Sequence, residues 1–166
     1  MDVRKIGPDD IDLVCRHREA MFQEAGFAAE TLRTMTQHFR EWLRPRLIDG
    51  SYFGFVLMDE RKPVAGVGLM MLDWPPHPAH PTQDKRGYVL NVYVDPAHRR
   101  RGLARQLMVL AEAEFAQRGA TFVILHATQA GRPLYEQGGW RQTSEMSKAI
   151  TPAALPAHFA TYFAPE

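Results

Sequence analysis

The sequence is poor in cysteine, in net charge and in long apolar runs, and each shortage excludes a class of protein. Cys15 is the only cysteine, so the chain cannot form an intramolecular disulfide or a zinc site built on several cysteines. The formal charge is only +1, from 20 basic and 19 acidic residues, which leaves no global field to attract nucleic acid or an anionic membrane. No stretch approaches the roughly 20 apolar residues that a helix needs to cross a bilayer.

These shortages, taken with the chain length, predict one globular domain of the cytoplasm. The first residues lack the apolar core of a signal peptide, and a single cysteine suits a reducing compartment. At 166 residues with 45% apolar content, the chain can bury a substantial core but is short for two, so we expect residues 1–166 to form a single domain. Cys15 is expected to be a small core residue rather than a nucleophile.

One run joins an apolar strand to a helix through a basic turn. Residues 89–94 are rich in valine, Pro96 stops the strand, three arginines follow at 99–101, and a helix begins near Gly102. The free N–H groups at a helix start can hold an anion, and Gly102 lets the backbone approach a phosphate closely. The run contains neither Gly-X-Gly-X-X-Gly nor Gly-Lys-Ser/Thr, so it predicts a cradle for a diphosphate of another kind. Taken alone, the arginines are explained equally well by a solvated helix start or a weak nucleic-acid patch.

Hydrophobic spacing and turn residues predict the order of the secondary structure. In the first half we expect a strand, two amphipathic helices and a hairpin of two strands, at residues 3–6, 11–22, 29–44, 51–58 and 64–72. Pro45 is expected to kink or end the second helix, and the prolines of residues 73–87 indicate a surface loop. After the strand of the basic run we expect a helix at residues 102–118 and a strand at 121–127. A short helix that ends at Gly138-Gly139 should follow, and then a final strand pair at 140–143 and 145–150. The tail, residues 152–166, is expected to pack outside or to be partly disordered.

Two separated motifs carry a resemblance to a known family. The first is Val-Tyr-Val-Asp-Pro at 92–96 with Arg-Arg-Arg-Gly-Leu-Ala at 99–104, and the second is Leu-Tyr-Glu-Gln-Gly-Gly-Trp at 134–140. Together they resemble the GCN5-related N-acetyltransferase (GNAT) superfamily, whose pyrophosphate loop reads Gln/Arg-X-X-Gly-X-Gly/Ala and whose later segment reads Leu-Tyr-Glu-X-X-Gly-Phe. The match covers nearly the whole chain. The chain departs from the family at Thr128, where asparagine is frequent, and at Trp140, where phenylalanine is usual.

The resemblance implies a fold of the α+β class with three layers, α/β/α. Its mixed, mostly antiparallel central sheet contains a parallel strand pair that splays apart, and pantetheine fills the gap and pairs with the backbone of Val92 and Val94. Asn91 marks a bulge of this strand or, with equal weight, is a solvent-facing residue of a regular one. The residues implied to bind the cofactor are Val92, Tyr93, Val94, Arg99, Arg100, Arg101, Gly102, Leu103, Ala104, Thr128 and Arg132.

The activity implied is direct transfer of the acetyl group of acetyl-coenzyme A to a primary amine of a small molecule or peptide, without a metal. By the resemblance, the N–H of Val92 holds the oxyanion, and Tyr135 is the general acid that protonates the leaving thiolate. The alternative for Tyr135 is a buried tyrosine hydrogen-bonded to backbone. Glu145 is the leading candidate for the general base, against a solvated surface glutamate. The base also stays open among Glu19, His17, His126, Asp73, His77 and His80.

The acceptor and two other functions stay open at this point. Candidates for binding a carboxylated or aromatic amine are Arg16, Arg18, Glu19 and Trp74. The charges of Arg16, Arg18 and Glu19 are explained as well by side chains that simply face solvent. A non-catalytic acyl-coenzyme A-binding module is the alternative function, and a nucleic-acid binder using arginines 99–101 is a third. We expect no nucleic-acid or membrane partner and leave a homodimer open.

Overall fold

A mixed sheet of five strands runs through the centre of the molecule. The structure is a computed structural model and describes residues 1–149. The strands lie in the order β1-β2-β3-β4-β5, with the bounds Asp2–Lys5, Tyr52–Asp59, Lys62–Asp73, Lys85–Val94 and Val123–Leu125. Neighbours from β1 to β4 are antiparallel, whereas β4 and β5 are parallel. The predicted hairpin of β2 and β3 and the predicted parallel pair are both confirmed.

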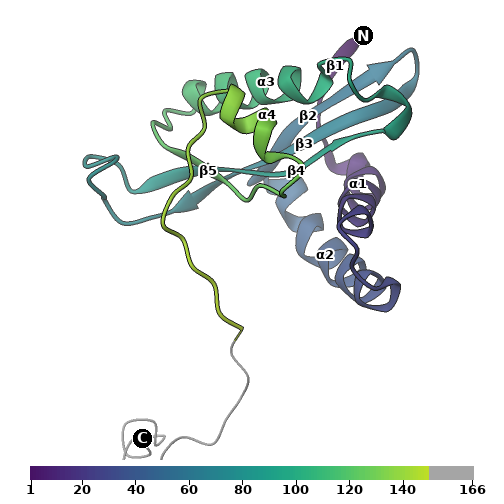
Figure 1. The fold of residues 1–166 in the computed structure, drawn as a ribbon, viewed down its shortest axis with the longest axis horizontal. Coiled ribbons are helices and arrows are strands. Elements are labelled where there is room, and N and C mark those ends of the chain that lie inside the picture. Colours follow the sequence, from purple (N-terminus) through teal and green to yellow (C-terminus); the bar gives the residue numbers. More distant parts are fainter. Residues whose placement is uncertain (150–166) are drawn as a thin grey trace, which may run out of the picture.

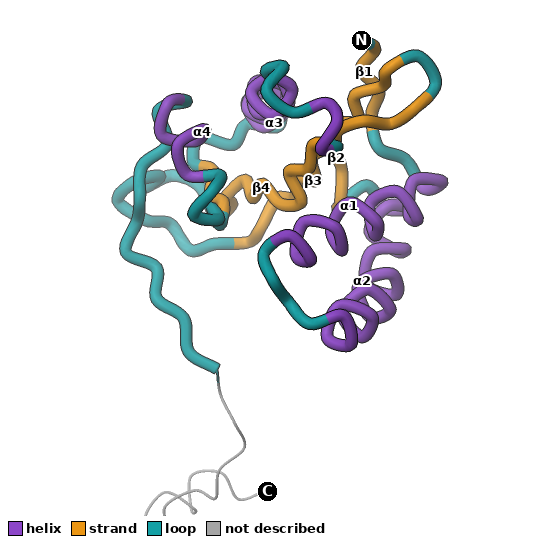
Figure 2. Tube along the Cα trace, turned by 45° about the vertical axis from the view of Figure 1, so that its right-hand side comes forward, coloured by secondary structure: helices purple, strands orange, loops and turns teal. Residues whose placement is uncertain are grey.

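Helices cover both faces of the sheet and give the molecule three layers (Figures 1 and 2). Helices α1 (Ile11–Glu24) and α2 (Ala29–Asp49) cover one face, and α3 (Leu103–Gln117) with α4 (Arg132–Gln137) covers the other. Short 3-10 helices at Pro8–Asp10 and Pro96–His98 precede α1 and α3. This α/β/α arrangement around a mostly antiparallel sheet is the fold class that the sequence predicted. None of the helices within residues 1–149 has the length and apolar character needed to cross a membrane.

Each face of the sheet has its own hydrophobic cluster. Leu69, Leu107 and Phe115 belong to the cluster under α3, whereas Cys15 and Leu43 belong to the cluster under α1 and α2. The helical members recur at three- and four-residue spacing, which is why the sequence revealed these helices. Cys15 is 1% exposed, and burial raises the pKa of its thiol, as expected for a core residue.

Helix α3 packs tightly on the sheet at Gly87. A Cβ at this position would lie 2.7 Å from Cδ1 of Phe115, and that ring is 1% exposed. We therefore expect Gly87→Ala to lower the free energy of unfolding by about 1–3 kcal/mol, because the packed ring cannot move aside. Denaturant titration measures this, with Gly7→Ala as control, since a Cβ at Gly7 would meet none of the described atoms within 4 Å. Equal stability of the two variants would contradict the tight packing.

The sequence predicted that Pro45 would kink or end helix α2. The helix instead continues through the proline to Asp49. Leu43 and Leu47, on either side of the proline, are both buried against the sheet. The side chain of Arg46 donates from Nη1 to the carbonyl of Trp42 at 2.7 Å, in the turn where the proline disturbs the helix ladder. Burial of the two leucines favours continuation of the helix, because it offsets the loss of the hydrogen bond that Pro45 cannot donate to the carbonyl of Glu41.

The predicted final strand pair is wrong for the residues that the structure describes. Residues 140–149 form no strand, and β5 is shorter than the predicted 121–127. The segment 141–145 is polar and mostly exposed, so it offers no apolar side chains that strand formation would bury. Residue 150 and the predicted tail 152–166 lie outside the described residues.

Candidate active site

Strands β4 and β5 are paired over a short stretch only and then separate. The parallel pairs are Gly87 with Val123, Tyr88 with Ile124 and Val89 with Leu125. Strand β5 ends there, whereas β4 continues to Val94. Residues 90–94 of β4 therefore have β3 on one edge and none of the described strands on the other. This is the splayed pair that the sequence predicted.

A β-bulge at Asn91 interrupts β4 where the gap opens. The register with β3 shifts between Gly66 and Gly68, and Asn91 has a φ of +55°. Its side chain is 6% exposed, donates from Nδ2 to the hydroxyl of Tyr52 at 2.9 Å and accepts from Nη1 of Arg18 at 2.7 Å. Asn91 is thus the predicted bulge, and the alternative of a solvent-facing residue is wrong.

The bulge decides which backbone groups face the gap. Before the bulge, the N–H of Gly87 points toward β5 and donates to the carbonyl of Phe122, the residue before this strand, at 2.9 Å. After it, the N–H of Asp95 points toward β3 and donates to the carbonyl of Val64 at 2.8 Å. Because N–H groups alternate along a strand, those of Val92 and Val94 face the gap. If the strand ran through Asn91 without a bulge, the N–H groups of the odd-numbered residues would face the gap instead.

The turn after β4 leaves the start of α3 open. Asp95 Oδ1 accepts a hydrogen bond from the N–H two residues on, at 2.9 Å, and Arg100 and Gly102 adopt left-handed conformations with φ of +64° and +78°. No side-chain hydrogen bond caps α3, and a Cβ at Gly102 would meet none of the described atoms within 4 Å. The first N–H groups of the helix are therefore free for an anion. The side chain of Leu103 is buried in the core, so this residue and Ala104 offer their backbone.

The three arginines of the basic run have different surroundings. Arg99 pairs through Nη2 with Oε1 of Glu24 at 2.6 Å and donates from Nε to the carbonyl of Val94 at 3.1 Å. It therefore ties the turn to the end of α1. Arg100 and Arg101 are exposed and form no ion pair with the rest of residues 1–149, so both are free to support an anion at the start of α3.

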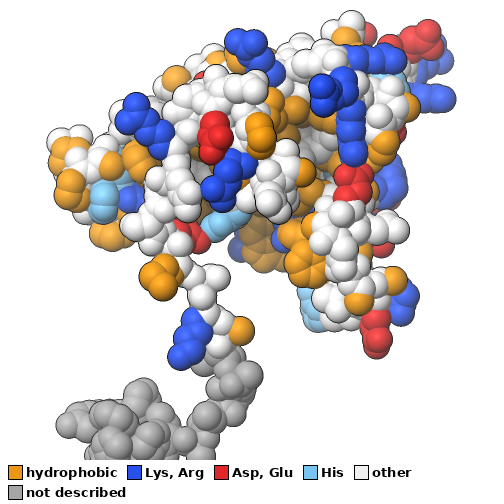
Figure 3. All heavy atoms as spheres, in the orientation of Figure 1, with side chains coloured by type: hydrophobic (Ala, Val, Ile, Leu, Met, Phe, Trp, Pro, Cys, Tyr) orange, Lys and Arg blue, Asp and Glu red, His pale blue; other side chains and the backbone are white. Residues whose placement is uncertain are grey.

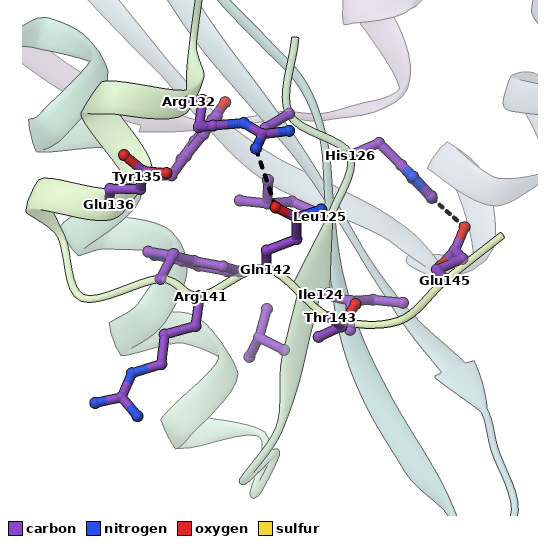
Figure 4. Close-up of a pocket in the computed structure, with 13 residues that line it drawn as sticks. Ile124, Leu125, His126, Arg132, Tyr135, Glu136, Arg141, Gln142, Thr143 and Glu145 are labelled. Carbon is purple, nitrogen blue, oxygen red and sulfur yellow. Dashed lines mark hydrogen bonds and ion pairs between the residues drawn. The ribbon is translucent and has the colours of Figure 1, made fainter. Parts of the chain in front are cut away.

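Tyr135 presents a free hydroxyl from α4. The ring packs on the cluster under α3 and lies edge-on to Trp140, with 6.3 Å between ring centres. The hydroxyl makes no hydrogen bond with other described residues, and burial raises the pKa of this phenol, so it is protonated at neutral pH. Tyr135 lines a cavity of about 230 Å³ with β5 and residues 140–145 (Figure 4). This geometry fits a proton donor better than a tyrosine held by the backbone.

Thr128 and Arg132 stabilise the turn that leads into α4. Oγ1 of Thr128 accepts the N–H of Gly131 at 3.1 Å, and its carbonyl accepts the N–H of Arg132 at 3.0 Å. Arg132 donates from Nη1 to Oε1 of Gln142 at 3.1 Å (Figure 4). Both side chains are exposed and keep further donors for a ligand.

Glu145 and His126 lie across β5 from Tyr135 in the view of Figure 4. Oε1 of Glu145 is 3.5 Å from Nε2 of His126, and the side chains are 55% and 60% exposed. The imidazole lies edge-on to Tyr88, with 5.6 Å between ring centres. The cavity thus brings the predicted acid and two of the candidate bases together, from opposite sides.

The other candidate bases lie outside this cavity. His17 is buried and stacks on Tyr93, with 4.5 Å between ring centres, and burial lowers its pKa to about 4. This stacking turns the Tyr93 side chain toward α1, and the backbone groups of Tyr93 face β3 rather than the gap. The remaining candidates are engaged by neighbouring groups elsewhere: Glu19, Asp73, His77 and His80.

Two features of the site could not be expected from the sequence. Gln142 receives the hydrogen bond of Arg132, and the side chain of Asn91 joins Arg18 to Tyr52. Arg18 and Asn91 are 73 positions apart, so no local pattern marks their contact.

The comparisons with known proteins agree with this geometry. The sequence matches the acetyltransferase (GNAT) family model over residues 15–140. A crystal structure of a GCN5-related N-acetyltransferase from Ralstonia eutropha JMP134 is 60% identical, with a TM-score of 0.88, over 90% of this chain and 97% of that one. A predicted acetyltransferase from Clostridium acetobutylicum, solved with acetyl-coenzyme A, is 21% identical, with a TM-score of 0.82, over 90% and 95%. An aminoglycoside acetyltransferase from an uncultured soil metagenomic sample is 22% identical, with a TM-score of 0.66, over 91% and 98%. Among curated proteins, none matches the sequence.

The residues that match the family model include the segments that form the candidate site. The matched region contains the gap between β4 and β5, the open start of α3 and the helix that carries Tyr135. The Ralstonia protein shares most of its residues with this sequence over nearly its whole length. The chain belongs to the GCN5-related N-acetyltransferase (GNAT) family of acetyltransferases.

Proposed function

We propose that this acetyltransferase transfers the acetyl group of acetyl-coenzyme A directly to a primary amine of a small molecule or peptide. The gap between β4 and β5 carries the proposal, because the N–H groups of Val92 and Val94 face it without a partner strand. A chain with amide groups, such as pantetheine, can pair with them as an added strand does. The Clostridium protein of the same fold binds acetyl-coenzyme A, which supports this donor.

The start of α3 supplies the place for the diphosphate of the donor. Its free N–H groups and the positive end of the helix dipole attract phosphate oxygens. Arg100 and Arg101 add charge from exposed positions, whereas Arg99 positions the turn through Glu24. Thr128 and Arg132, at the start of α4, have exposed donors for the remaining part of the coenzyme arm.

The groups around the cavity can carry the charge and proton movements of the reaction. As the amine nitrogen attacks the thioester carbon, the N–H of Val92 stabilises the negative charge that forms on the carbonyl oxygen. The carbon–sulfur bond then breaks, and Tyr135 gives its proton to the sulfur. The proton lost by the amine passes to His126 or Glu145, directly or through water. None of these steps requires a covalent enzyme intermediate.

Release of free thiol from acetyl-coenzyme A in the presence of primary amines tests the proposal. The panel should hold amino acids, polyamines, aminoglycosides and short peptides, each paired with its N,N-dimethyl derivative, which cannot form an amide. We expect at least one primary amine to release thiol well above the amine-free rate and to yield an N-acetylated product by mass spectrometry. Calorimetric binding of acetyl-coenzyme A without turnover of any amine would instead indicate the non-catalytic binding module.

A further inference from the structure

Arg18 is a largely buried cation for which the described residues provide no carboxylate. Its guanidinium lies over the rings of Phe22 and Phe39, at 4.9 and 4.6 Å from the ring centres. Nη1 donates to Oδ1 of Asn91 at 2.7 Å. Nε is buried without a partner among residues 1–149, and Nη2 donates to none of them. The buried Arg86 also lacks a carboxylate, but its Nε donates to Nε2 of His80 at 2.7 Å. Four arginines in this part of the chain pair with an aspartate or glutamate: Arg4, Arg40, Arg99 and Arg118.

The titratable groups that face Arg18 do not balance its charge. They are the phenols of Tyr52 and Tyr88 and the thiol of Cys15. Burial raises the pKa of all three, so they are neutral at pH 7. A buried charge without a counter-ion is unfavourable, which indicates a position that an anionic ligand completes.

Arg18, on α1, lies on the same side of the sheet as His126, one of the two candidate bases at the cavity. Its partner Asn91 directly precedes Val92, whose N–H faces the gap. Tyr88 pairs with Ile124, so His126, two residues further along, lies on the same face of the sheet and contacts the Tyr88 ring. Tyr135, by contrast, packs on the α3 side. Figure 3 shows the surface hollowed between the lobe of α1 and α2 and the segment that follows α4, with hydrophobic side chains inside.

We propose that Arg18 binds a carboxylate of the acceptor, so that the substrates are amino acids and related amines with a carboxylate close to the amine. This inference rests on the proposed function and narrows its substrate class. Nε and Nη2 share one edge of the planar guanidinium, the edge that binds a carboxylate through two hydrogen bonds. The same positive charge disfavours the ammonium form of the bound amine and so favours the neutral form that attacks.

Pairs of acceptors that differ only in the carboxylate test the proposal. For each amino acid and its carboxamide, kcat/KM is measured with the wild type, with Arg18→Gln and with Arg18→Lys. We expect the wild type to favour the acid, and Arg18→Gln to lower kcat/KM for acids by about 10- to 100-fold while leaving that for carboxamides nearly unchanged. Arg18→Lys should keep part of the preference. The exposed Arg33→Gln on α2 is the matched control and should keep all of it.

The outcomes separate this inference from the proposed function. Turnover of carboxamides as efficient as that of acids, or an equal loss for both in Arg18→Gln, overturns the inference and leaves the acetyltransferase function standing. The second result would make Arg18 a residue that only positions Asn91, and a weaker affinity for acetyl-coenzyme A by calorimetry would accompany it. Turnover of no amine at all overturns the proposed function and the inference with it.

Discussion

Replacing Tyr135 by phenylalanine is expected to lower kcat by about 100-fold or more, and to leave the affinity for acetyl-coenzyme A nearly unchanged. The substitution removes only the hydroxyl, which makes no hydrogen bond with other described residues, and keeps the ring against Trp140. The thiolate would then leave without its proton donor. Burial raises the pKa of Tyr135, so the phenol stays protonated below that pKa and loses its proton only above the ordinary value near 10. On the alkaline side, the wild-type rate should therefore fall only at strongly alkaline pH, and Tyr135→Phe should lack this fall.

Steady-state thiol release across pH, together with calorimetry of acetyl-coenzyme A, measures both effects. Gln137→Ala, at an exposed position of the same helix, is the matched control and should keep the wild-type rate. A phenylalanine variant with an unchanged rate would remove Tyr135 from the chemistry. A variant that loses donor affinity in proportion to its rate would make Tyr135 a packing residue instead.

Replacing Gly102 by leucine is expected to weaken acetyl-coenzyme A binding by about 100-fold or more, since it removes two or more charge-assisted hydrogen bonds. The added side chain would occupy the open space in front of the first N–H groups of α3, where a Cβ now meets none of the described atoms within 4 Å. The left-handed backbone, with φ of +78°, adds strain of about 1–2 kcal/mol for a residue with a side chain. Calorimetry gives the affinity, and denaturant titration gives the stability.

Gly119, just beyond the other end of α3, provides the matched control for this variant. It has the same φ of +78°, and a Cβ there would also meet none of the described atoms within 4 Å. Gly119→Leu should therefore lose similar stability but keep its affinity for acetyl-coenzyme A. If both variants lose affinity equally, backbone strain explains the effect, and the start of α3 is not the diphosphate site.

The sequence predicted those parts of the fold that local chemistry determines. The apolar spacing within α1, α2 and α3 and the turn residues of the basic run act over a few positions, so each could be recognised alone. The gap between β4 and β5 is different, because no spacing within either strand shows that two strands separate. It was expected only through the resemblance to the family, and the register of the two strands confirms it.

Contacts between distant segments could not be predicted from the sequence. Arg99 seemed from its neighbours to serve an anion, yet its main partner is Glu24, which lies 75 positions earlier. Pro45 was expected to disturb α2, and the burial of Leu43 and Leu47 outweighed that local preference. Similarly, Arg18 could be named as a surface charge or a ligand group, and only its burial over two aromatic rings distinguishes these alternatives.

The bulge at Asn91 couples the facing of the site to the number of residues in β4. The register places three steps of β4, from Leu90 to Tyr93, against two steps of β3. Deleting Asn91 would remove the extra step and keep the N–H of Val92 at the gap. A strand that kept Asn91 but lost the bulge would instead exchange the two faces of everything that follows in β4, and the N–H of Tyr93 would replace that of Val92. The strand could thus retain every residue and still present the wrong backbone groups to the gap.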